Sequence, residues 1–183
     1  MQNDNLKSYL HLHVIVFIWG FTAILGKLIS LEALDLVWYR MLFASVIMTF
    51  VVLLSKEKVK VPFNVLIGFI VSGIIIAAHW LTFYQAIKVS NVSITLACLS
   101  TGAFFVSILE PIFYKRKVIW YELLFGVIVV VGLGIIFNVE TKYKTGIYLA
   151  VTSAFLSALF SVINGKYAKE YNPNIISLYE LSS

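Results

Sequence analysis

Three ionisable side chains stand inside long apolar runs of this sequence, where burying a charge is costly and such residues are usually functional. Arg40 lies in LVWYRMLFASVIM, His79 in AAHWLTFYQA and Glu110 in ILEPIFYKRK. An arginine can hold a carboxylate or phosphate, an imidazole titrates near neutral pH, and a carboxyl group can carry a proton. The sequence therefore offers Arg40 for binding a charged solute, and His79 and Glu110 for coupling to protons.

Arg40 and Glu110 also have structural explanations. Arg40 lies about one turn inside the end of its apolar run, so its side chain could snorkel to the interface. Glu110 could pair with the basic turn that follows it, Lys115, Arg116 and Lys117. For Glu110 we favour this pairing, and for Arg40 both explanations stay open.

The surroundings of His79 indicate which way its ring points. At helical spacing it shares one face with Ser72, Thr82 and Ala86. This stripe predicts that His79 faces protein or a cavity rather than lipid. A lone histidine is more often a satisfied core residue than a ligand, so both roles stay open. Trp80 and Tyr84 nearby fit the aromatic belt of a membrane interface.

Motifs of catalytic sites are absent from the sequence. It contains no HExxH, no GxSxG and no Walker loop. His11, His13 and His79 do not have zinc-site spacing, and the one cysteine, Cys98, lies in an apolar run. We therefore expect no enzymatic activity, no metal and no cofactor.

The composition predicts an integral membrane protein. Hydrophobic residues make up 61% and charged residues 13% of 183 residues, and the mean hydropathy is +0.94. Soluble domains have roughly 45–50% apolar and about 25% charged residues. The net charge of +5 comes from residues between the apolar runs. This charge therefore indicates no nucleic-acid partner, and the expected partners are membrane lipid and a small-molecule substrate.

The elements that must position these residues are membrane-length helices. Apolar segments cover about residues 10–29, 36–54, 65–87, 91–114, 119–137 and 145–168, and about 20 residues cross one hydrocarbon core. Asn172, Pro173 and Asn174 have the pattern of a helix start, with asparagine as the cap. The predicted fold is an all-α polytopic membrane helix bundle with six transmembrane helices and the start of a seventh.

Basic residues between the segments predict the orientation. Of the 14 Lys and Arg residues, nine fall on the side of the N-terminus and five on the other side. Those on the N-terminal side are Lys7, Lys56, Lys58, Lys60, Lys115, Arg116, Lys117, Lys166 and Lys169. Positive charge stays cytoplasmic, so residues 1–9 are expected to form a cytoplasmic leader.

The sequence also contains a short internal repeat. Phe17 to Lys27, FIWGFTAILGK, aligns with Leu156 to Lys166, LSALFSVINGK, and WYRML at Trp38 to Leu42 aligns with LYELS at Leu178 to Ser182. An odd number of crossings between the copies gives them opposite orientations, as in inverted-repeat transporters. We expect a first five-helix repeat at 10–139 and the start of a second at 144–183. The chain then is a fragment of a ten-helix protein, or alternatively a naturally short product.

The last apolar segment carries a stripe of small and weakly polar residues. The stripe consists of Ser153, Ser157, Ser161, Asn164 and Ala168. Small faces allow helices to pack closely in lipid, and this is the favoured interpretation. The alternative is the polar lining of a cavity.

Several of these features together resemble the EamA domain of the drug/metabolite transporter superfamily. They are WGFTAILGK in the first segment, Arg40, AIKVSN at Ala86 to Asn91, and LEPIF. The resemblance implies ten helices in two inverted repeats and alternating access, with export of amino-acid-like or other small solutes across a bacterial-type inner membrane. It also implies a central cavity, lined here by Trp19, Thr22, Arg40, His79, Ser100 and Asn164.

One departure from the family pattern concerns an acidic residue. Members commonly have a glutamate about nine residues before a glycine, in the turn between helices four and five. Counting back from Gly126 gives Lys117 instead, so the role of that acid is either absent here or displaced to Glu122.

Three other possibilities remain beside this one. A small-multidrug-type exporter has four helices and usually an acid in the first, which this chain lacks. A non-transporting membrane assembly subunit and a homodimer both stay open.

Overall fold

The computed structural model describes residues 2–55, 57, 59–139 and 141–183. Over these residues the chain forms α-helices and one short 3₁₀ turn, with no strand, so the all-α prediction is confirmed. In chain order the elements are α1 (Gln2–Leu28), α2 (Ala33–Ser55), α3 (Phe63–Val89), α4 (Val92–Leu99), α5 (Gly102–Tyr114), α6 (Trp120–Val139), the 3₁₀ turn η1 (Thr141–Tyr143), α7 (Lys144–Tyr167) and α8 (Pro173–Ser182). Lys56 and Lys58, which were counted for the orientation, lie outside the described residues.

Five stretches of the described chain are long and apolar enough to cross a membrane. They are Leu6–Leu28, Ala33–Ser55, Phe63–Val89, Val92–Tyr114 and Lys144–Tyr167, and a shorter apolar helix covers Trp120–Ile135. The chain is therefore an integral membrane protein. The residues expected as a leader are helical from Gln2 onward, because α1 begins there.

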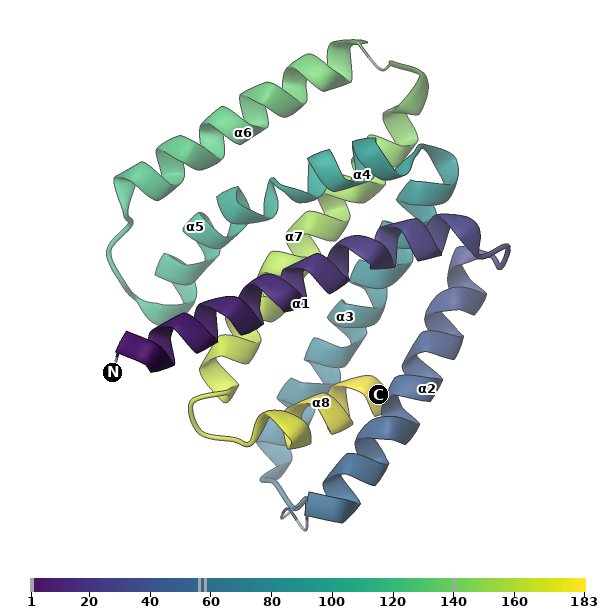
Figure 1. Cartoon of the computed structure of the whole chain (residues 1–183). Coiled ribbons are helices and arrows are strands. Elements are labelled where there is room, and N and C mark those ends of the chain that lie inside the picture. The colour runs from purple at the N-terminus through teal and green to yellow at the C-terminus, as the bar shows by residue number, and fades with distance from the viewer. Residues whose placement is uncertain (1, 56, 58, 140) are drawn as a thin grey trace.

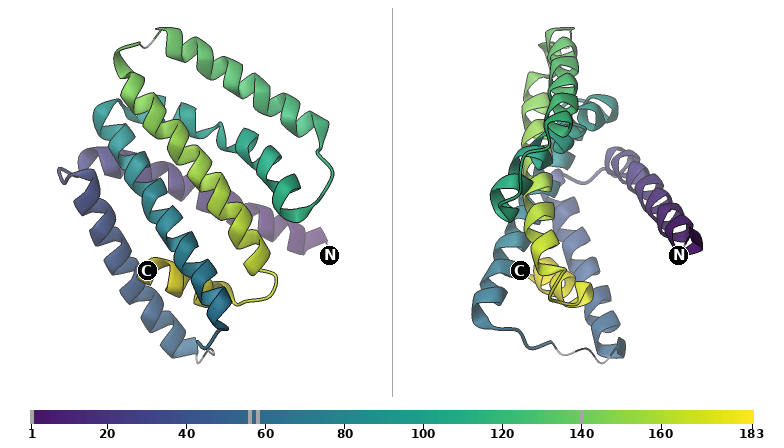
Figure 2. Two further views of the ribbon diagram at one scale, coloured as in Figure 1. Left: turned by 180° about the vertical axis from the view of Figure 1, so that it is seen from behind. Right: turned by 90° about the vertical axis from the view of Figure 1, so that its left-hand side faces the viewer.

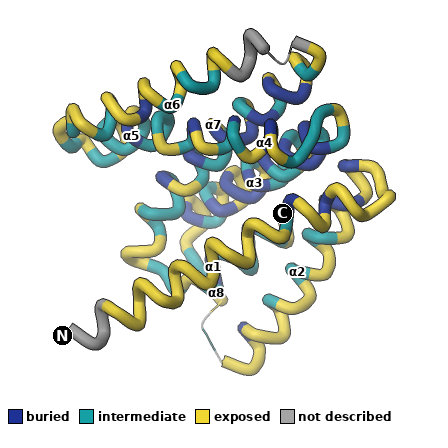
Figure 3. The backbone as a smooth tube through the Cα atoms, turned by 45° about the horizontal axis from the view of Figure 1, so that its top comes forward, coloured by how far each residue is buried: buried dark blue, intermediate teal, exposed yellow. Residues whose placement is uncertain are grey.

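The helices form a layer with α3 and α7 at its centre. In this layer α6 packs on α5, α5 on α7, α7 on α3, and α3 on α2 (Figures 1 and 2). α1 crosses one face over α3 and α4, while α8 packs across α2 and α3. Buried residues concentrate in the centre, and α1 is exposed over most of its length (Figure 3). The C-terminal end of α2 and the N-terminal end of α7 lie at opposite ends of this layer (Figure 1).

The fourth predicted segment is broken rather than continuous. Asn91 caps α4 by accepting a hydrogen bond from the Ile94 N–H at 2.9 Å, but α4 ends at Leu99 and α5 starts at Gly102. At the break, the hydroxyls of Ser100 and Thr101 donate to the carbonyls of Ala97 and Cys98 at 2.6 and 2.7 Å. These hydroxyls compete for backbone acceptors, and i→i+3 bonding replaces the α-helical pattern.

Pro111 lies inside α5 without interrupting the helix, although proline removes a backbone donor. α5 runs through this proline to Tyr114, and Lys115 ends it with a left-handed φ of 52°. A membrane helix tolerates proline where neighbouring groups satisfy the freed backbone positions. The discontinuity of this segment therefore comes from two hydroxyl residues and not from its proline.

The predicted start of the last helix is confirmed. Asn172 accepts a hydrogen bond from the Asn174 N–H at 2.8 Å, and Pro173 is the first residue of α8. Proline fits there because its missing N–H would have no intrahelical partner. This cap fixes the point at which α8 turns back onto α2 and α3.

The buried face of α7 follows alanines more than the predicted serine stripe. Its buried members include Ala150, Ala154 and Ala158 together with Ser153, whereas Ser161 is exposed. Small side chains let α7 approach α3 closely, and no hydrophobic force between helices is available in lipid to compensate for poor packing. Close packing was the favoured interpretation of this helix, and the structure extends it to the alanines.

Candidate functional site

Arg40 lies on α2 against an aromatic platform that α3 provides. Its guanidinium carbon is 4.1 Å from the centroid of the Trp80 ring and 5.9 Å from that of Tyr84. The guanidinium also donates a hydrogen bond to the Tyr84 hydroxyl. A cation over an aromatic face is attracted by the ring quadrupole, more strongly when water is excluded. Arg40 is half-buried, and this packing holds its charge in one place.

The partners of Arg40 differ from the expected interfacial belt. Tyr84 is only 3% exposed and belongs to a core cluster with Phe83 and Ile87. Trp80 is half-buried and packs against the same cluster. These two aromatics therefore position a charged side chain inside the protein. Gly26 of α1 lies against the Tyr84 ring, where a Cβ atom would collide with it.

His79 faces α7, as the stripe predicted. The side chain is 9% exposed, and its Nδ1 lies 2.9 Å from both the hydroxyl and the carbonyl oxygen of Ser153. The Ser153 hydroxyl is also 3.1 Å from the His79 carbonyl oxygen. Phe83 and Phe160 flank the ring, with centroid distances of 6.2 and 5.8 Å. His79 and Ser153 thus form a polar link between the two central helices.

The two sites lie at one level of α3, on different sides of it. Trp80 and His79 are consecutive, yet Trp80 contacts Arg40 of α2 and His79 contacts Ser153 of α7. The structure therefore places Arg40 and His79 at the same level along α3, on different sides of this helix. We call Arg40, His79, Trp80, Tyr84 and Ser153 the α3 polar level.

The other residues of the expected cavity lie elsewhere. Trp19 is 68% exposed on α1, and Thr22 one turn later is half-buried. Ser100 is exposed, with its hydroxyl bonded within its own helix. Asn164 is eleven residues beyond Ser153 on α7, or roughly 16 Å by helical rise. The Asn164 side chain donates to the carboxyl group of Glu180 at 3.1 Å.

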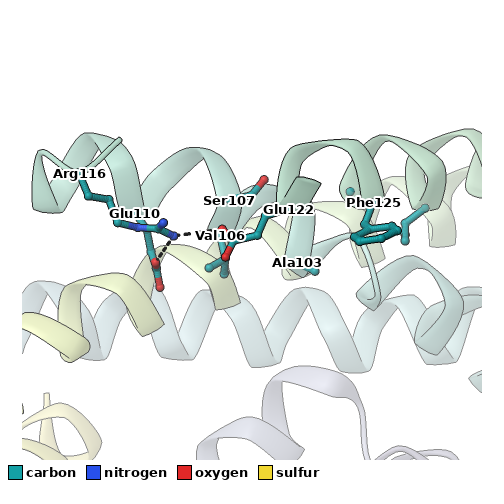
Figure 4. Close-up of a pocket in the computed structure, with 9 residues that line it drawn as sticks. Ala103, Val106, Ser107, Glu110, Arg116, Glu122 and Phe125 are labelled. Atoms are coloured by element: carbon teal, nitrogen blue, oxygen red, sulfur yellow. Dashed lines mark hydrogen bonds and ion pairs between the residues drawn. The ribbon is translucent and has the colours of Figure 1, made fainter. Parts of the chain in front are cut away.

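Glu110 pairs with the basic turn, as the favoured interpretation had it. Arg116 Nη2 lies 2.5 Å from Glu110 Oε2 and 3.2 Å from Glu122 Oε2, across the turn from α5 to α6 (Figure 4). The hydrogen bond to Glu110, followed by that to Glu122, raises the pKa of the Arg116 guanidinium. Beside this bridge is a cavity of about 440 Å³ lined by residues that include Val106, Ser107 and Phe125.

Glu180 is the residue that reasoning from the sequence missed. It lies on α8 and is 3% exposed. The internal repeat does point to Glu180, because aligning WYRML with LYELS places Glu180 at the position of Arg40. Because this alignment pairs Glu180 with Arg40, an ionisable residue in an apolar run, Glu180 could have been named as a candidate site residue from the sequence.

The comparisons with known proteins agree with the helical architecture. Residues 6–138 match the EamA-like transporter family. No curated protein and no solved structure matches the chain. The match covers the first five apolar segments and therefore both Arg40 and His79.

Proposed function

The chain belongs to the EamA-like transporter family, and on this basis we propose that it exports a small, amino-acid-like solute across an inner cell membrane. The family is one of membrane transporters of the drug/metabolite type and not of enzymes. The observation that carries the proposal is the α3 polar level, where Arg40 and His79 lie on two sides of one helix. Buried polar groups at one depth are typical of a substrate pathway.

Arg40 supplies the recognition chemistry in this proposal. A guanidinium binds a carboxylate through two parallel hydrogen bonds, and this geometry suits the acid group of an amino acid. Among the described residues Arg40 makes one hydrogen bond, to Tyr84, which leaves further donors for a ligand. The Trp80 ring fixes the plane of the guanidinium. The site thus favours solutes with a carboxylate.

The link between α3 and α7 supplies the moving part. Alternating access requires two helices of the bundle to change their contact around a fixed site. The contact of His79 with Ser153 can exchange, because the ring nitrogen donates or accepts according to its protonation. His79 in this proposal couples the contact of the two helices to a proton.

The proposal includes the inverted repeat and the orientation. In it α7 and α8 begin a second copy of the five-segment module, upside down relative to α1 and α2. The matching pairs Gly26 with Gly165 and Lys27 with Lys166 support this alignment. The excess of basic residues on the N-terminal side supports a cytoplasmic N-terminus.

Transport can be measured directly with the purified protein in proteoliposomes. Vesicles preloaded with an unlabelled neutral amino acid are expected to accumulate the same amino acid in labelled form by counterflow. The amide of that amino acid, which lacks the carboxylate, should not compete. A panel of neutral amino acids with no counterflow above that of empty vesicles would contradict the proposed substrate class.

A further inference from the structure

Three buried oxygen atoms, one each on α3, α7 and α8, have no hydrogen-bond partner among the described residues. They are Ser72 Oγ on α3, Asn164 Oδ1 on α7 and Glu180 Oε1 on α8. Ser72 is fully buried and Glu180 is 3% exposed. A buried polar atom without a partner costs roughly 1–3 kcal/mol. On each of these three helices, therefore, a buried oxygen lacks a hydrogen-bond partner at about the same level.

The packing of α8 brings Glu180 to this place. Ile176 packs against Phe69 in one core cluster, and one turn later the Glu180 carbonyl lies against Gly73. A Cβ atom at Gly73 would collide with that carbonyl. Only a glycine permits this close approach, because its lack of a side chain lets two backbones meet. Glu180 is therefore held at the level of Ser72 and Gly73.

The register of α3 and α7 brings Asn164 to the same level. His79 meets Ser153, and Gly68 meets Tyr167, so the two helices run in opposite directions. Ser72 lies between His79 and Gly68 on α3, just as Asn164 lies between Ser153 and Tyr167 on α7. Ser72 and Asn164 are therefore at about the same height in the bundle. The hydrogen bond from Asn164 Nδ2 to Glu180 Oε2, 3.1 Å long, joins α7 to α8 there.

The unpaired atoms of Glu180 and Asn164 are complementary if one proton is added. An ionised carboxylate only accepts hydrogen bonds, as does the amide oxygen. Asn164 Oδ1 and Glu180 Oε1 would then both remain unsatisfied. A protonated carboxyl group has one O–H donor, and Oε1–H can donate to Oδ1 while Nδ2–H donates to Oε2. One proton on Oε1 would thus supply the donor that both unpaired oxygens lack.

Among the described residues, no neighbouring charged side chain offers Glu180 an alternative partner. The charged and imidazole side chains of α2, α3 and α7, the helices around Glu180, are Asp35, Arg40, His79, Lys88, Lys144 and Lys166. None of them forms an ion pair with Glu180 within the described part of the chain, where its side-chain partner is Asn164. Burying an isolated carboxylate is so unfavourable that such a group generally takes up a proton.

We propose that Glu180 and Asn164 form a one-proton binding site, occupied in this conformation and emptied when α8 separates from α7. The site rests on the proposed transport function for its use, since release of the proton would then accompany the change of access. Its existence does not depend on that use. At the same level of α3, the Ser72 hydroxyl can hydrogen-bond a water that carries the proton away.

Infrared difference spectroscopy on the purified full chain tests the protonation of Glu180. The wild-type protein at neutral pH is expected to show the carbonyl band of a protonated carboxyl group, which disappears on raising the pH. Glu180→Gln keeps the shape and the paired geometry, so it should fold and lack the band. Asn164→Ala should shift the band, because a free acid carbonyl differs from a hydrogen-bonded one. Glu110→Gln, which changes a carboxylate paired with Arg116, should leave it unchanged.

Three outcomes of this experiment would overturn the site. They are a missing band in the wild type, a band that survives in Glu180→Gln, and a band that responds to sodium ions but not to pH. The last of these would identify a sodium site.

A second measurement separates this site from the transport function. Counterflow by Glu180→Gln is expected to lose its pH dependence while that of the wild type keeps it. A wild type that has the band but shows no counterflow would refute the proposed function and leave the proton site standing.

Discussion

Replacing Arg40 by glutamine is expected to slow transport of a carboxylate-bearing solute by at least about tenfold. A hydrogen bond to a charged group contributes about 1.5–3 kcal/mol, and each 1.4 kcal/mol corresponds to a factor of ten in binding. Glutamine removes the charge, the paired donors and the contact with the Trp80 ring. The rate of counterflow at low solute concentration measures the loss.

Two further variants separate charge from geometry at this position. Arg40→Lys keeps the charge but not the planar fork, and we expect an intermediate rate. Arg116→Gln removes the same type of side chain from a site already paired with Glu110 and Glu122, and it should transport at the wild-type rate. If Arg40→Gln folds and transports as fast as the wild type, Arg40 does not bind the solute.

Breaking the link between His79 and Ser153 is the second large effect we expect. His79→Phe fills the space between Phe83 and Phe160 but removes the ring nitrogen that contacts Ser153, whose hydroxyl keeps only the backbone carbonyl of residue 79. Losing one hydrogen bond between buried groups costs about 0.5–1.5 kcal/mol. We expect the free energy of unfolding in detergent to fall by that amount, and counterflow to decrease because α3 and α7 lose their exchangeable contact.

A double-mutant cycle shows whether the two residues act together. Side-chain hydrogen bonds between membrane helices average about 0.6 kcal/mol in such cycles, with a maximum near 1.7. His79→Phe combined with Ser153→Ala should therefore destabilise the protein by less than the sum of the single changes. Thr152→Ala, one residue away on the exposed side of α7, is the matched control. Strict additivity of the two changes would show that His79 is only a packing residue.

The sequence predicted five of its six membrane helices at the right places, because their signal is strong, while the segment at 119–137 forms a shorter apolar helix among the described residues. A run of about 20 apolar residues between polar turns has few alternatives in a bilayer. The cap at Asn172 and Pro173 was predictable for a similar reason, since asparagine and proline have clear preferences at a helix start.

The break between α4 and α5 could not be predicted from the same signals. Ser100 and Thr101 bond to carbonyls of the preceding turn, but serine and threonine often do so without ending a helix. Pro111 had the stronger sequence signal and is nevertheless helical. α4 and α5 both pack against α7 on either side of the break.

The candidate site was predictable in its charged members but not in their partners. Arg40 and His79 were conspicuous because charges in apolar runs are rare. The partners Tyr84 and Ser153 looked ordinary, because a helix that is apolar on all sides has little periodicity to show which face meets protein. Glu180 lay too near the end of the sequence to be recognised as part of an apolar run.

The sidedness of two lysines tests the central claim, an inverted module with an odd number of crossings, most directly. Cys98 is fully buried, so a Cys98→Ser protein can carry a single new cysteine for an impermeant maleimide. Lys60→Cys and Lys144→Cys mark the turns before α3 and at the start of α7. We predict that Lys60→Cys is labelled only from the cytoplasmic side of the membrane and Lys144→Cys only from the opposite side. Labelling of both cysteines from the same side would contradict the inverted repeat and the transporter built on it.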